Sequence, residues 1–484
     1  RIAVFADCQL TEARNGGATD YSIPFFKNHL KLCKRQNVDV IVIPGDLVNN
    51  AVQNYYRKVN TMIKDVYGED KSKHPEFVYS MGNHEWYTNE SSEQEDLRAV
   101  KLFKKYARIG TPNLVKTSES YIVSQDDTSA NYYKVINGIP FVSVSGTNNS
   151  GFLLSDEVNE LESWFKDISK LKSVKNGGPI YVSYHYPIKN LTYSYGQGAS
   201  LYSESIDKVL SKYPQVVLFT GDTHFSAVTE RTINQVNYTN INVGSSCYSR
   251  HVSYGAMQKN EEHYYNMKGN TKDQITGEVS QNYNKTPHIH IIDVDEKGNA
   301  TYNRYFSTED PKNPIKLGLT WEIPAKITKD QFIYTNNRFQ DKTWANKMYQ
   351  KDGLIWDENA QLKAIRGAEE TQIVFPDVID YHYCEHYIIE ITGETIKNFD
   401  FVSNYYKWED SPHTNNFVIK NYDLPEGTSF DVKVTAFDYF DNPSLNNLIT
   451  QYLFFYWVKV SILVPIFSIK FKKLFNLQNV SAII

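Results

Sequence analysis

The sequence predicts an α/β domain followed by an all-β domain, and three patterns along the chain support this prediction. Over about the first 230 residues, short apolar runs of strand length alternate with amphipathic stretches, which is typical of a sheet with helices on its faces. From about residue 225, strand-like runs such as 241–244 and 289–294 follow one another without a helical period, which indicates a second sheet closing the same domain. From about residue 371 to residue 448 the pattern is entirely that of strands.

Four apolar runs in the first region predict strands that end at one edge of a sheet. They span residues 2–6, 38–44, 77–81 and 216–220, and each ends directly before a Gly or an Asp, with polar residues gathered after it. Residues 24–36 and 155–171 are predicted to be helices, with Pro24 in a first turn and Ser155 as an N-cap. Ligand sites in open α/β sheets lie outside the carboxyl ends of the strands, so we expect one site after these runs.

The all-β region contains one strongly alternating segment. Its inward positions are expected to be Phe430, Val432, Val434 and Ala436, and its outward positions Asp431, Lys433 and Thr435. The segment resembles the penultimate strand of a fibronectin type III or similar immunoglobulin-like sandwich, although that family usually has Tyr where Phe430 stands. We therefore divide the chain into an α/β domain (1–307), a poorly defined connector (308–370), a β-sandwich (371–448) and an apolar C-terminal tail (449–484).

Composition excludes some classes of partner. Lys and Arg number 51 against 56 Asp and Glu, so the formal charge of -5 gives no general attraction to nucleic acid or to anionic lipid. We expect no nucleic-acid groove. The four cysteines form neither a zinc-finger spacing nor a dense disulfide framework, and they do not indicate a compartment.

The two ends of the chain allow further expectations. Arg1 stands inside a strand-like run, which fits removal of upstream residues such as a signal peptide. Residues 452–469 are strongly apolar but contain Lys459 and Pro465. A Lys at mid-membrane depth costs a few kcal/mol, so we favour a buried terminal strand or an irregular tail over a membrane helix, and expect no membrane attachment.

Five short motifs follow strand-like runs in the first 230 or so residues. They are Asp7-Cys8-Gln9, Gly45-Asp46-Leu47-Val48-Asn49, Gly82-Asn83-His84-Glu85, Tyr184-His185-Tyr186-Pro187 and Gly221-Asp222-Thr223-His224. Hydrolysis by two metal ions needs oxygen and imidazole ligands that converge on one place, with a carboxylate shared between cations about 3.5 to 4 Å apart. Asp, Asn, Gln and His at strand ends supply such ligands. Each motif alone is a weak signal, and Asp7 or Asp46 alone could simply cap a turn.

In this order the motifs resemble the calcineurin-like metallophosphoesterases, whose pattern is Asp-x-His, Gly-Asp, Gly-Asn-His-Asp/Glu, His and Gly-His-x-His. The resemblance implies a four-layer αββα sandwich for the first domain. It implies that Asp46 bridges two metals, that Asp7 and His224 belong to the first metal, and that Asn83 and His185 belong to the second. His84 would be the catalytic acid, with Glu85 or Asn49 able to influence it.

Gln9 and Asp222 depart from the family pattern, which usually has His at both positions. A Gln carbonyl can still ligate, and some branches of the superfamily carry Gln here, so both residues are kept as candidate metal ligands; contact through water or a neighbouring carboxylate is the alternative. The expected cofactors are two divalent ions, with Mn, Zn, Fe and Mg all open. Oxygen ligands favour the harder Mn²⁺ or Mg²⁺ over Zn²⁺.

The function implied by the resemblance is hydrolysis of a phosphoric ester by a metal-bridged hydroxide, with a small phosphorylated substrate. Asn49 and Asn50 replace the Asp and Arg of the protein serine/threonine phosphatase motif, so a diester or a nucleotide is preferred over a phosphoprotein. The alternative is a non-catalytic binding protein on a decayed phosphoesterase scaffold, with Gln9 and Asp222 as signs of decay. The C-terminal module suggests a cell-surface or polymer partner, and we expect an extracellular or cell-surface location.

Overall fold

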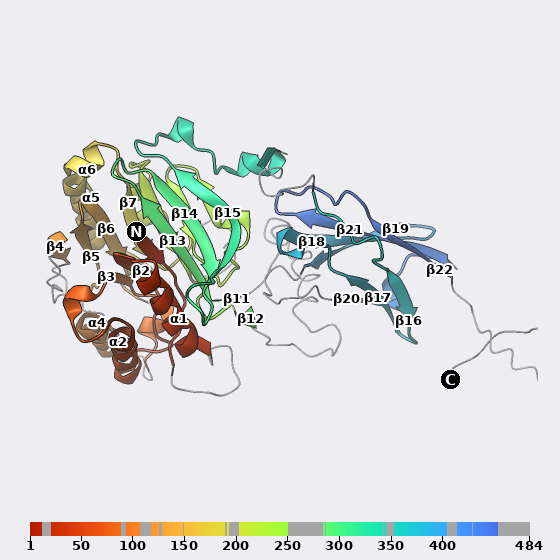
Figure 1. Ribbon diagram of the computed structural model, residues 1–484, viewed down its shortest axis with the longest axis horizontal. Coiled ribbons are helices and arrows are strands. Elements are labelled where there is room, and N and C mark those ends of the chain that lie inside the picture. Colours follow the sequence, from red (N-terminus) through yellow and green to blue (C-terminus); the bar gives the residue numbers. More distant parts are fainter. Residues whose placement is uncertain are drawn as a thin grey trace, which may run out of the picture.

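The structure is a computed structural model, shown in Figure 1. It describes residues 1–11, 21–88, 93–106, 118–124, 128–148, 150–188, 191–192, 203–249, 284–285, 287–341, 343–344, 353–403, 414–427 and 429–453.

Two mixed sheets form the centre of the N-terminal domain. In spatial order the six-stranded sheet consists of β15 (Ile315–Ile323), β14 (Ala300–Phe306), β13 (His288–Val294), β1 (Ile2–Val4), β2 (Val40–Pro44) and β3 (Glu76–Ser80). The seven-stranded sheet consists of β4 (Ser118–Val123), β5 (Tyr132–Ile136), β6 (Ile139–Val144), β7 (Ile180–Tyr184), β8 (Val216–Thr220), β10 (Thr239–Asn242) and β9 (Ile233–Gln235). Within the two sheets β1, β2 and β3 are parallel, and so are β6, β7, β8 and β10.

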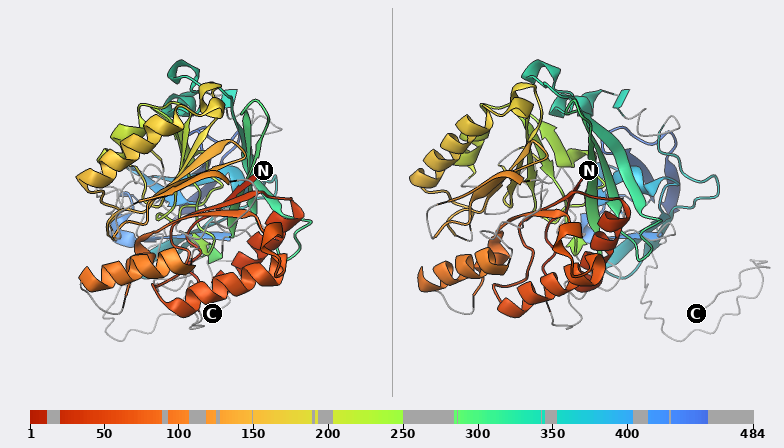
Figure 2. Two further views of the ribbon diagram at one scale, coloured as in Figure 1. Left: turned by 90° about the vertical axis from the view of Figure 1, so that its left-hand side faces the viewer. Right: turned by 60° about the vertical axis from the view of Figure 1, so that its left-hand side comes forward.

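Helices cover the outer face of each sheet, as the two views of Figure 2 show. The helices of this domain are α1 (Ser22–Arg35), α2 (Gln53–Tyr67), α3 (Asn83–Trp86), α4 (Glu93–Tyr106), α5 (Ser155–Ile168), α6 (Lys172–Lys175) and α7 (Glu204–Leu210). Side chains of α1, α2 and α4 pack with the six-stranded sheet, and those of α5 and α7 pack with the seven-stranded one. Apolar residues from both sheets meet between them, so the predicted four-layer αββα fold is confirmed.

The grouping of strands into sheets differs from the prediction. β1, β2 and β3 share a sheet with the late strands β13 to β15, whereas β8 belongs to the other sheet. An apolar run predicts that a strand exists, but the partner of each strand depends on side-chain packing between distant segments. The expected second sheet made of the later strands is therefore wrong, although the two-sheet architecture is right.

The start of α5 also differs from the prediction. The N-cap is Leu154, and Ser155 is the first helical residue. The Glu157 carboxylate accepts a hydrogen bond from the N–H of the N-cap Leu154 at 2.9 Å, which is the half of a capping box that needs no hydroxyl at the N-cap.

Two antiparallel sheets form the C-terminal part of the chain. One has the order β16 (Lys363–Arg366), β17 (Glu370–Pro376), β20 (Thr414–Lys420), and the other β19 (Ile396–Val402), β18 (Cys384–Thr392), β21 (Ser429–Asp438), β22 (Leu448–Leu453). Along β21, Phe430, Val432, Val434 and Ala436 are buried as predicted. Thr435 is buried as well, against the prediction. The expected all-β region is confirmed.

Short elements complete the described structure. They are the ribbon β11 (Tyr248–Ser249) with β12 (Asn284–Lys285) and the 3₁₀ turns η2 (Lys71–Lys73), η4 (Glu230–Thr232), η5 (Lys329–Gln331), η6 (Asn336–Gln340), η7 (Tyr381–Tyr383) and η8 (Asn421–Asp423).

The range 308–370, predicted to be a connector, contains parts of both folded regions. β15 is the edge strand of the six-stranded sheet, and β16 pairs with β17. Residues 449–453 of the predicted tail belong to β22, and residues 454–484 lie outside the described residues. Among the residues that the structure describes, no helix is long and apolar enough to cross a membrane.

Buried charged side chains join the C-terminal sheets to the N-terminal domain. Arg231, in η4, lies 3.2 Å from Glu385 of β18, and both side chains are almost fully buried. Arg304 of β14 pairs with buried Glu230 and donates to three successive carbonyls at residues 227–229. Residues 227–231, which follow the Gly221-Asp222-Thr223-His224 motif, are therefore held by Arg304 of β14 and by Glu385 of β18.

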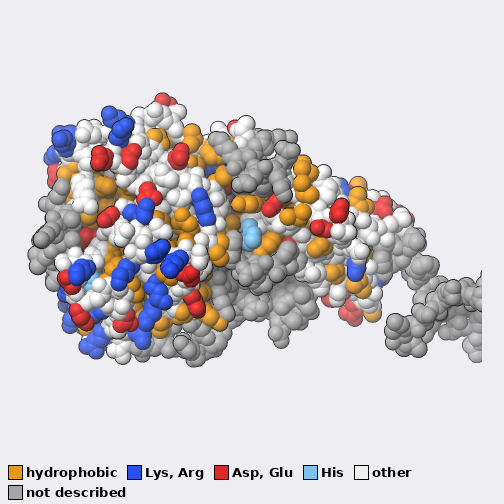
Figure 3. Space-filling view, in the orientation of Figure 1, with side chains coloured by type: hydrophobic (Ala, Val, Ile, Leu, Met, Phe, Trp, Pro, Cys, Tyr) orange, Lys and Arg blue, Asp and Glu red, His pale blue; other side chains and the backbone are white. Residues whose placement is uncertain are grey.

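The outer surface carries both signs of charge. On the face in Figure 3, Lys and Arg side chains gather over α1 and α2, with Asp and Glu side chains among them. In α1, Lys31, Lys34 and Arg35 are exposed, and Lys27 pairs with Asp65 at 3.2 Å.

Candidate metal centre

The predicted site residues lie shortly after parallel strands, on loops or, for Asn83 and His84, in the short helix α3. Asp7 follows β1, Asp46 follows β2 and Asn83 and His84 follow β3, while His185 follows β7 and Asp222 and His224 follow β8. The carboxyl ends of strands from both sheets thus meet at one edge, where the sequence placed the site.

The backbone of these loops is strained at the predicted ligands. Asp7, Gln9, Asp46, Asp222 and His224 all have positive φ, between 43° and 67°. Residues other than Gly seldom adopt this region, and such conformations gather at functional sites. Here the sharp turns bring side chains from separate strands toward one point.

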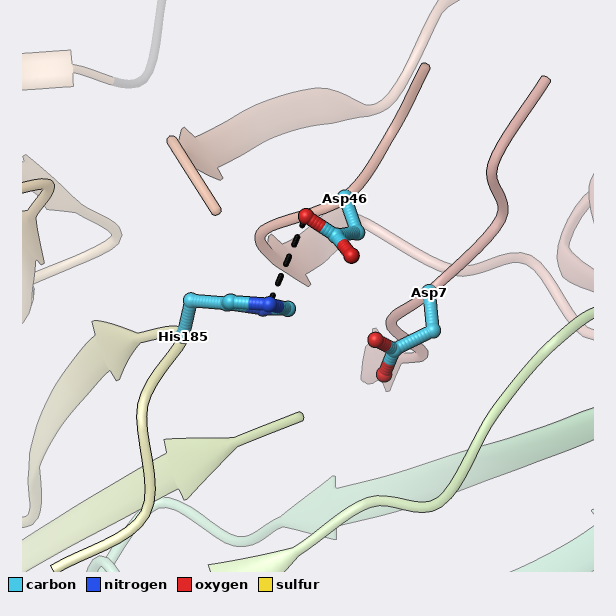
Figure 4. A group of neighbouring side chains, drawn as sticks. All are labelled: Asp7, Asp46 and His185. Atoms are coloured by element: carbon cyan, nitrogen blue, oxygen red, sulfur yellow. Dashed lines mark ion pairs between the residues drawn. The ribbon is translucent and has the colours of Figure 1, made fainter. Parts of the chain in front are cut away.

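Three buried groups form the centre of the cluster, as Figure 4 shows. Asp7, Asp46 and His185 each offer a ligand atom, and these atoms all lie within 4.8 Å of one another. The Nε2 atom of His185 is 3.4 Å from Asp46 Oδ1 and 3.9 Å from Asp222 Oδ1. This group has the size and composition to hold a metal ion.

Further predicted residues surround this centre. His224 Nε2 lies 3.3 Å from Asp7 Oδ1, and the Asp222 N–H donates to the same oxygen at 3.1 Å. Asn83 Oδ1 lies 3.1 Å from His185 Nε2. The structure therefore brings together the residues that the motifs singled out.

The three histidines present the same ring nitrogen to the cluster. In each histidine the Nδ1 atom lies close to a backbone carbonyl oxygen. The distance is 2.9 Å from His185 Nδ1 to the Pro44 oxygen, 3.0 Å from His224 Nδ1 to the Tyr248 oxygen and 2.7 Å from His84 Nδ1 to the Asn49 oxygen. With a proton on Nδ1 donated to the carbonyl, the Nε2 atoms of His185 and His224 keep their lone pairs directed at the cluster. This is the orientation that metal-binding histidines need.

Gln9 lies among the ligands with its amide nitrogen toward them. Its Nε2 donates to Asp46 Oδ2 at 3.3 Å and lies 3.1 Å from His84 Nε2 and 3.3 Å from His224 Nε2. The expected ligation by the Gln9 carbonyl therefore differs from the arrangement in the structure, and needs a rotation of the amide. The sequence cannot fix this orientation, because it depends on three neighbours from distant segments.

Glu85, which was expected to be able to influence His84, bonds to backbone N–H groups of the site. Its carboxylate accepts hydrogen bonds from the N–H groups of Gly82, Asp46 and Val48, at 2.7, 2.9 and 3.0 Å. It therefore ties the Asp46 loop to the Asn83 loop. Asn49 does act on His84, but through its backbone carbonyl.

Mutual proximity shifts the protonation of these groups. The pKa of Asp46 lies well below its usual range, because the nearby His185 and His84 outweigh burial, which alone would raise it. Burial would lower the pKa of His185, but Asp46 raises it well above the usual value. Burial and the charge of Asp46 raise the pKa of Glu85 to about 8, and burial raises that of Asp222.

Comparison with known proteins agrees with this geometry. Residues 1–226 match the family model described as calcineurin-like phosphoesterase. These residues form a calcineurin-like metallophosphoesterase domain. The match ends before β13, β14 and β15, which complete the six-stranded sheet of the metallophosphoesterase domain.

The solved structures that the chain matches include two phosphatases. A dimetal phosphatase from Danio rerio is 10% identical, with a TM-score of 0.41 over 65% of this chain and 98% of that one. A purple acid phosphatase from yellow lupin (Lupinus luteus) seeds is 11% identical, with a TM-score of 0.42 over 69% of this chain and 55% of its own. A search of curated proteins gave no match.

Orphaned oxygens in the metallophosphoesterase domain fit bound cations. The Oδ2 atoms of Asp7 and Asp222 are buried, and neither has a hydrogen-bond partner within the described part of the chain. A buried carboxylate oxygen without a partner is costly, and a divalent cation would compensate it. The donor set of carboxylate, amide and imidazole groups suits such ions.

Two glycines leave room for the ligands. A Cβ atom on Gly82 would stand 2.3 Å from Asp46 Oδ1, and one on Gly45 would stand 2.3 Å from His185 Nδ1. The metallophosphoesterase domain needs Gly at these positions of its motifs because the backbone there lies directly against the side chains of Asp46 and His185.

Two tyrosines at the site were not predicted. Tyr248 stacks on the His224 ring with centroids 4.2 Å apart, and Tyr87 contacts both Asn83 and His84. The position of Tyr87, four residues after Asn83, was a usable signal because residues four apart in a helix share a face. Tyr248 comes from a distant segment, and nothing in its local sequence connects it with His224.

Proposed function

We propose that this protein hydrolyses phosphoric esters, with two divalent cations held by Asp7, Asp46, Asn83, His185, Asp222 and His224, and by Gln9 after rotation of its amide. The observation that supports this most is the convergence of buried Asp7, Asp46 and His185 at the carboxyl ends of parallel strands in a metallophosphoesterase domain. Such cations supply charge neutralisation on the phosphoryl oxygens and lower the pKa of a bound water. We also propose that Asp7-Cys8-Gln9 is a variant of the first family motif, with Gln9 at the position that usually holds His.

Each residue then has a role set by its position. Asp46 Oδ1 lies 3.4 Å from His185 Nε2, and a ligand atom of Asp46 lies within 4.8 Å of one of Asp7, so Asp46 is placed to be shared between two cations. Asp7 and His224 form one group, and Asn83 and His185 the other. Asp222 joins them, because its N–H donates to Asp7 and its carboxylate faces His185.

His84 is proposed as the general acid that protonates the leaving alkoxide. Its side chain is 22% exposed, so it reaches the edge of the cluster where a substrate enters, and its Nε2 lies 3.8 Å from Asp46 Oδ2. The His84 N–H donates to Asp46 Oδ1 at 3.0 Å, and Nδ1 is fixed on the Asn49 carbonyl. This anchoring holds the ring for proton transfer at Nε2.

Within this proposal the substrate is a small phosphodiester or nucleotide, and the cations are Mn²⁺, Zn²⁺, iron or Mg²⁺. Carboxylate and amide oxygens at Gln9 and Asp222, where the family usually has His, favour the harder ions. We also propose that the C-terminal sheets are a fibronectin type III-like module that presents the enzyme to a cell-surface or polymer partner outside the cytoplasm. The alternation along β21 supports the module assignment.

Hydrolysis by metal-stripped protein tests the proposal. Bis-p-nitrophenyl phosphate, p-nitrophenyl phosphate and a 5′-nucleotide are each assayed with Mn²⁺, Zn²⁺, Fe²⁺ or Mg²⁺ added back. We expect metal-dependent turnover. A folded protein that turns over none of these substrates with any metal would instead favour the non-catalytic scaffold.

A His84→Ala variant tests the acid. p-Nitrophenolate leaves readily without protonation, whereas a ribose alkoxide does not, so the loss should be larger for the nucleotide, by roughly 10² or more. Bound metal should not change. His74→Ala is the matched control, because His74 precedes β3 at the opposite end of the strand from His84. Equal activity of the His84→Ala variant and wild type on the nucleotide would exclude this role.

A further inference from the structure

Tyr87 makes its polar side-chain contact with a predicted metal ligand. It stands at the C-cap of the short helix α3, and its hydroxyl oxygen accepts a hydrogen bond from Asn83 Nδ2 at 2.9 Å. At the other end of the same amide, Asn83 Oδ1 faces His185 Nε2 at 3.1 Å. The Asn83 amide therefore spans from the Tyr87 hydroxyl to the cluster, with its oxygen at the inner end.

The orientation of this amide matters because only its oxygen can bind a cation. The NH₂ group is a donor with no acceptor capacity, so an amide turned the other way would present two hydrogens to the metal position. The two orientations have nearly the same shape. In the structure the Tyr87 hydroxyl accepts from the outer NH₂ group, and this bond holds the amide with its oxygen at the end that faces the cluster.

Tyr87 also contacts the proposed general acid. Its ring lies edge-on to His84, with centroids 4.9 Å apart and an interplanar angle of 62°. Two hydrogen bonds fix the backbone of Tyr87. The Ala51 N–H donates to the Tyr87 carbonyl at 2.9 Å, and the Tyr87 N–H donates to the His84 carbonyl at 3.2 Å. These bonds connect Tyr87 to the segment after β2 and to the segment after β3, so the position of its ring is well defined.

Tyr87 stands at the site and not in an apolar core. It is 38% exposed and belongs to none of the core clusters of the described residues. Its contacts through the hydroxyl and the ring go to Asn83 and His84, which are both predicted site residues.

We propose that Tyr87 is a positioning residue of the metal centre: its hydroxyl turns the Asn83 oxygen toward the second cation, and its ring holds His84. This inference rests on the proposed function, since it requires that Asn83 ligates a metal. It assigns separate roles to the hydroxyl and to the ring, and two substitutions separate them.

The test is a Mn²⁺ titration of the metal-free full chain, with free Mn²⁺ followed by electron paramagnetic resonance. Tyr87→Phe removes the hydroxyl and keeps the ring. We expect the affinity of one of two sites to fall by about 10-fold, the range seen when a partner of a ligating residue is lost, and the other site to stay unchanged. Tyr67→Phe is the matched control, since it removes a tyrosine hydrogen bond to Leu30 in the same domain.

Activity gives an independent readout. Loss in Tyr87→Phe should be restored by excess Mn²⁺, because only occupancy is reduced. Tyr87→Leu removes the ring as well, and should retain a deficit on the nucleotide substrate that excess Mn²⁺ does not restore. Thermal unfolding of each variant shows that it is folded.

Unchanged Mn²⁺ affinity in folded Tyr87→Phe would overturn the inference, even if the wild type hydrolyses esters. Wild-type protein that binds two Mn²⁺ but hydrolyses no ester would contradict the proposed function, while a weakened site in Tyr87→Phe would still support the role of the hydroxyl. A wild type that binds no Mn²⁺ would overturn both.

Discussion

Replacing Gly82 with Ala should disable the site without changing any charge or ligand. The backbone of Gly82 has φ -108° and ψ -173°, an extended conformation that Ala adopts freely, so the effect comes from space alone. The added Cβ would stand 2.3 Å from Asp46 Oδ1, 2.7 Å from the Asp46 nitrogen and 2.7 Å from His185 Cδ2. Ordinary contact begins at 3.4 Å, so the Asp46 carboxylate must move by roughly 1 Å.

A displacement of this size at a shared ligand is large in functional terms. A misplacement of about 1 Å can cost about 10² in rate, and overpacking of a buried position costs about 1 to 3 kcal/mol. We therefore expect Gly82→Ala to lose at least about 10² in metal-dependent hydrolysis and to bind Mn²⁺ more weakly.

The assay measures bis-p-nitrophenyl phosphate hydrolysis and Mn²⁺ affinity side by side, with thermal unfolding to show that the variant is folded. Gly367→Ala is the control, because the nearest atom to its added Cβ is Glu370 O at 3.2 Å, in the C-terminal sheets. A Gly82→Ala variant with wild-type activity and wild-type Mn²⁺ affinity would refute the placement of Asp46 and His185 against this glycine.

Two further predictions concern stability. His29, His288 and His290 are fully buried, and burial is the main cause that lowers each pKa from 6.5 to about 3. As the pH falls, these histidines take up protons in the unfolded chain before they do so in the folded one. The free energy of unfolding should therefore be highest above about pH 6.5 and fall toward pH 3, by on the order of a few kcal/mol per histidine. Thermal unfolding across this pH range checks the prediction, and a flat profile would contradict it. Arg231→Met should lower the free energy of unfolding, measured by urea denaturation, by about 3 to 5 kcal/mol, because Glu385 stays buried without the Arg231 cation. The double variant Arg231→Met with Glu385→Met should recover part of this loss. If the losses of the two single variants simply add, the two side chains are not directly coupled.

Local features of the fold were predictable from the sequence, and long-range ones were not. The run 216–220 matches β8 to the residue, and β2 and α1 lie within a few residues of their predicted bounds, because each is set by its own apolar pattern and its flanking Gly, Asp or Pro. The sheet to which β8 belongs depends on packing against distant strands. β15 was hidden in a predicted connector because Gly318 interrupts it and its burial alternates irregularly.

The site followed the same division. Asp7, Asp46 and His185 were predicted to be ligands from the resemblance of the ordered motifs to the calcineurin-like metallophosphoesterases, and their common location was predicted because each follows an apolar strand. The amide orientation of Gln9 and the bonds of Glu85 to backbone N–H groups were not, since both depend on how separate loops meet. The stacking of Tyr248 on His224 belongs to the same category.

The most direct test of the account is a single titration of metal-free protein with Mn²⁺, in which bound metal and hydrolysis of bis-p-nitrophenyl phosphate are measured in the same samples. The account predicts that the chain binds two Mn²⁺ and that turnover appears as the second binds. A folded chain that binds no Mn²⁺, or one that hydrolyses the ester equally well without metal, would contradict it.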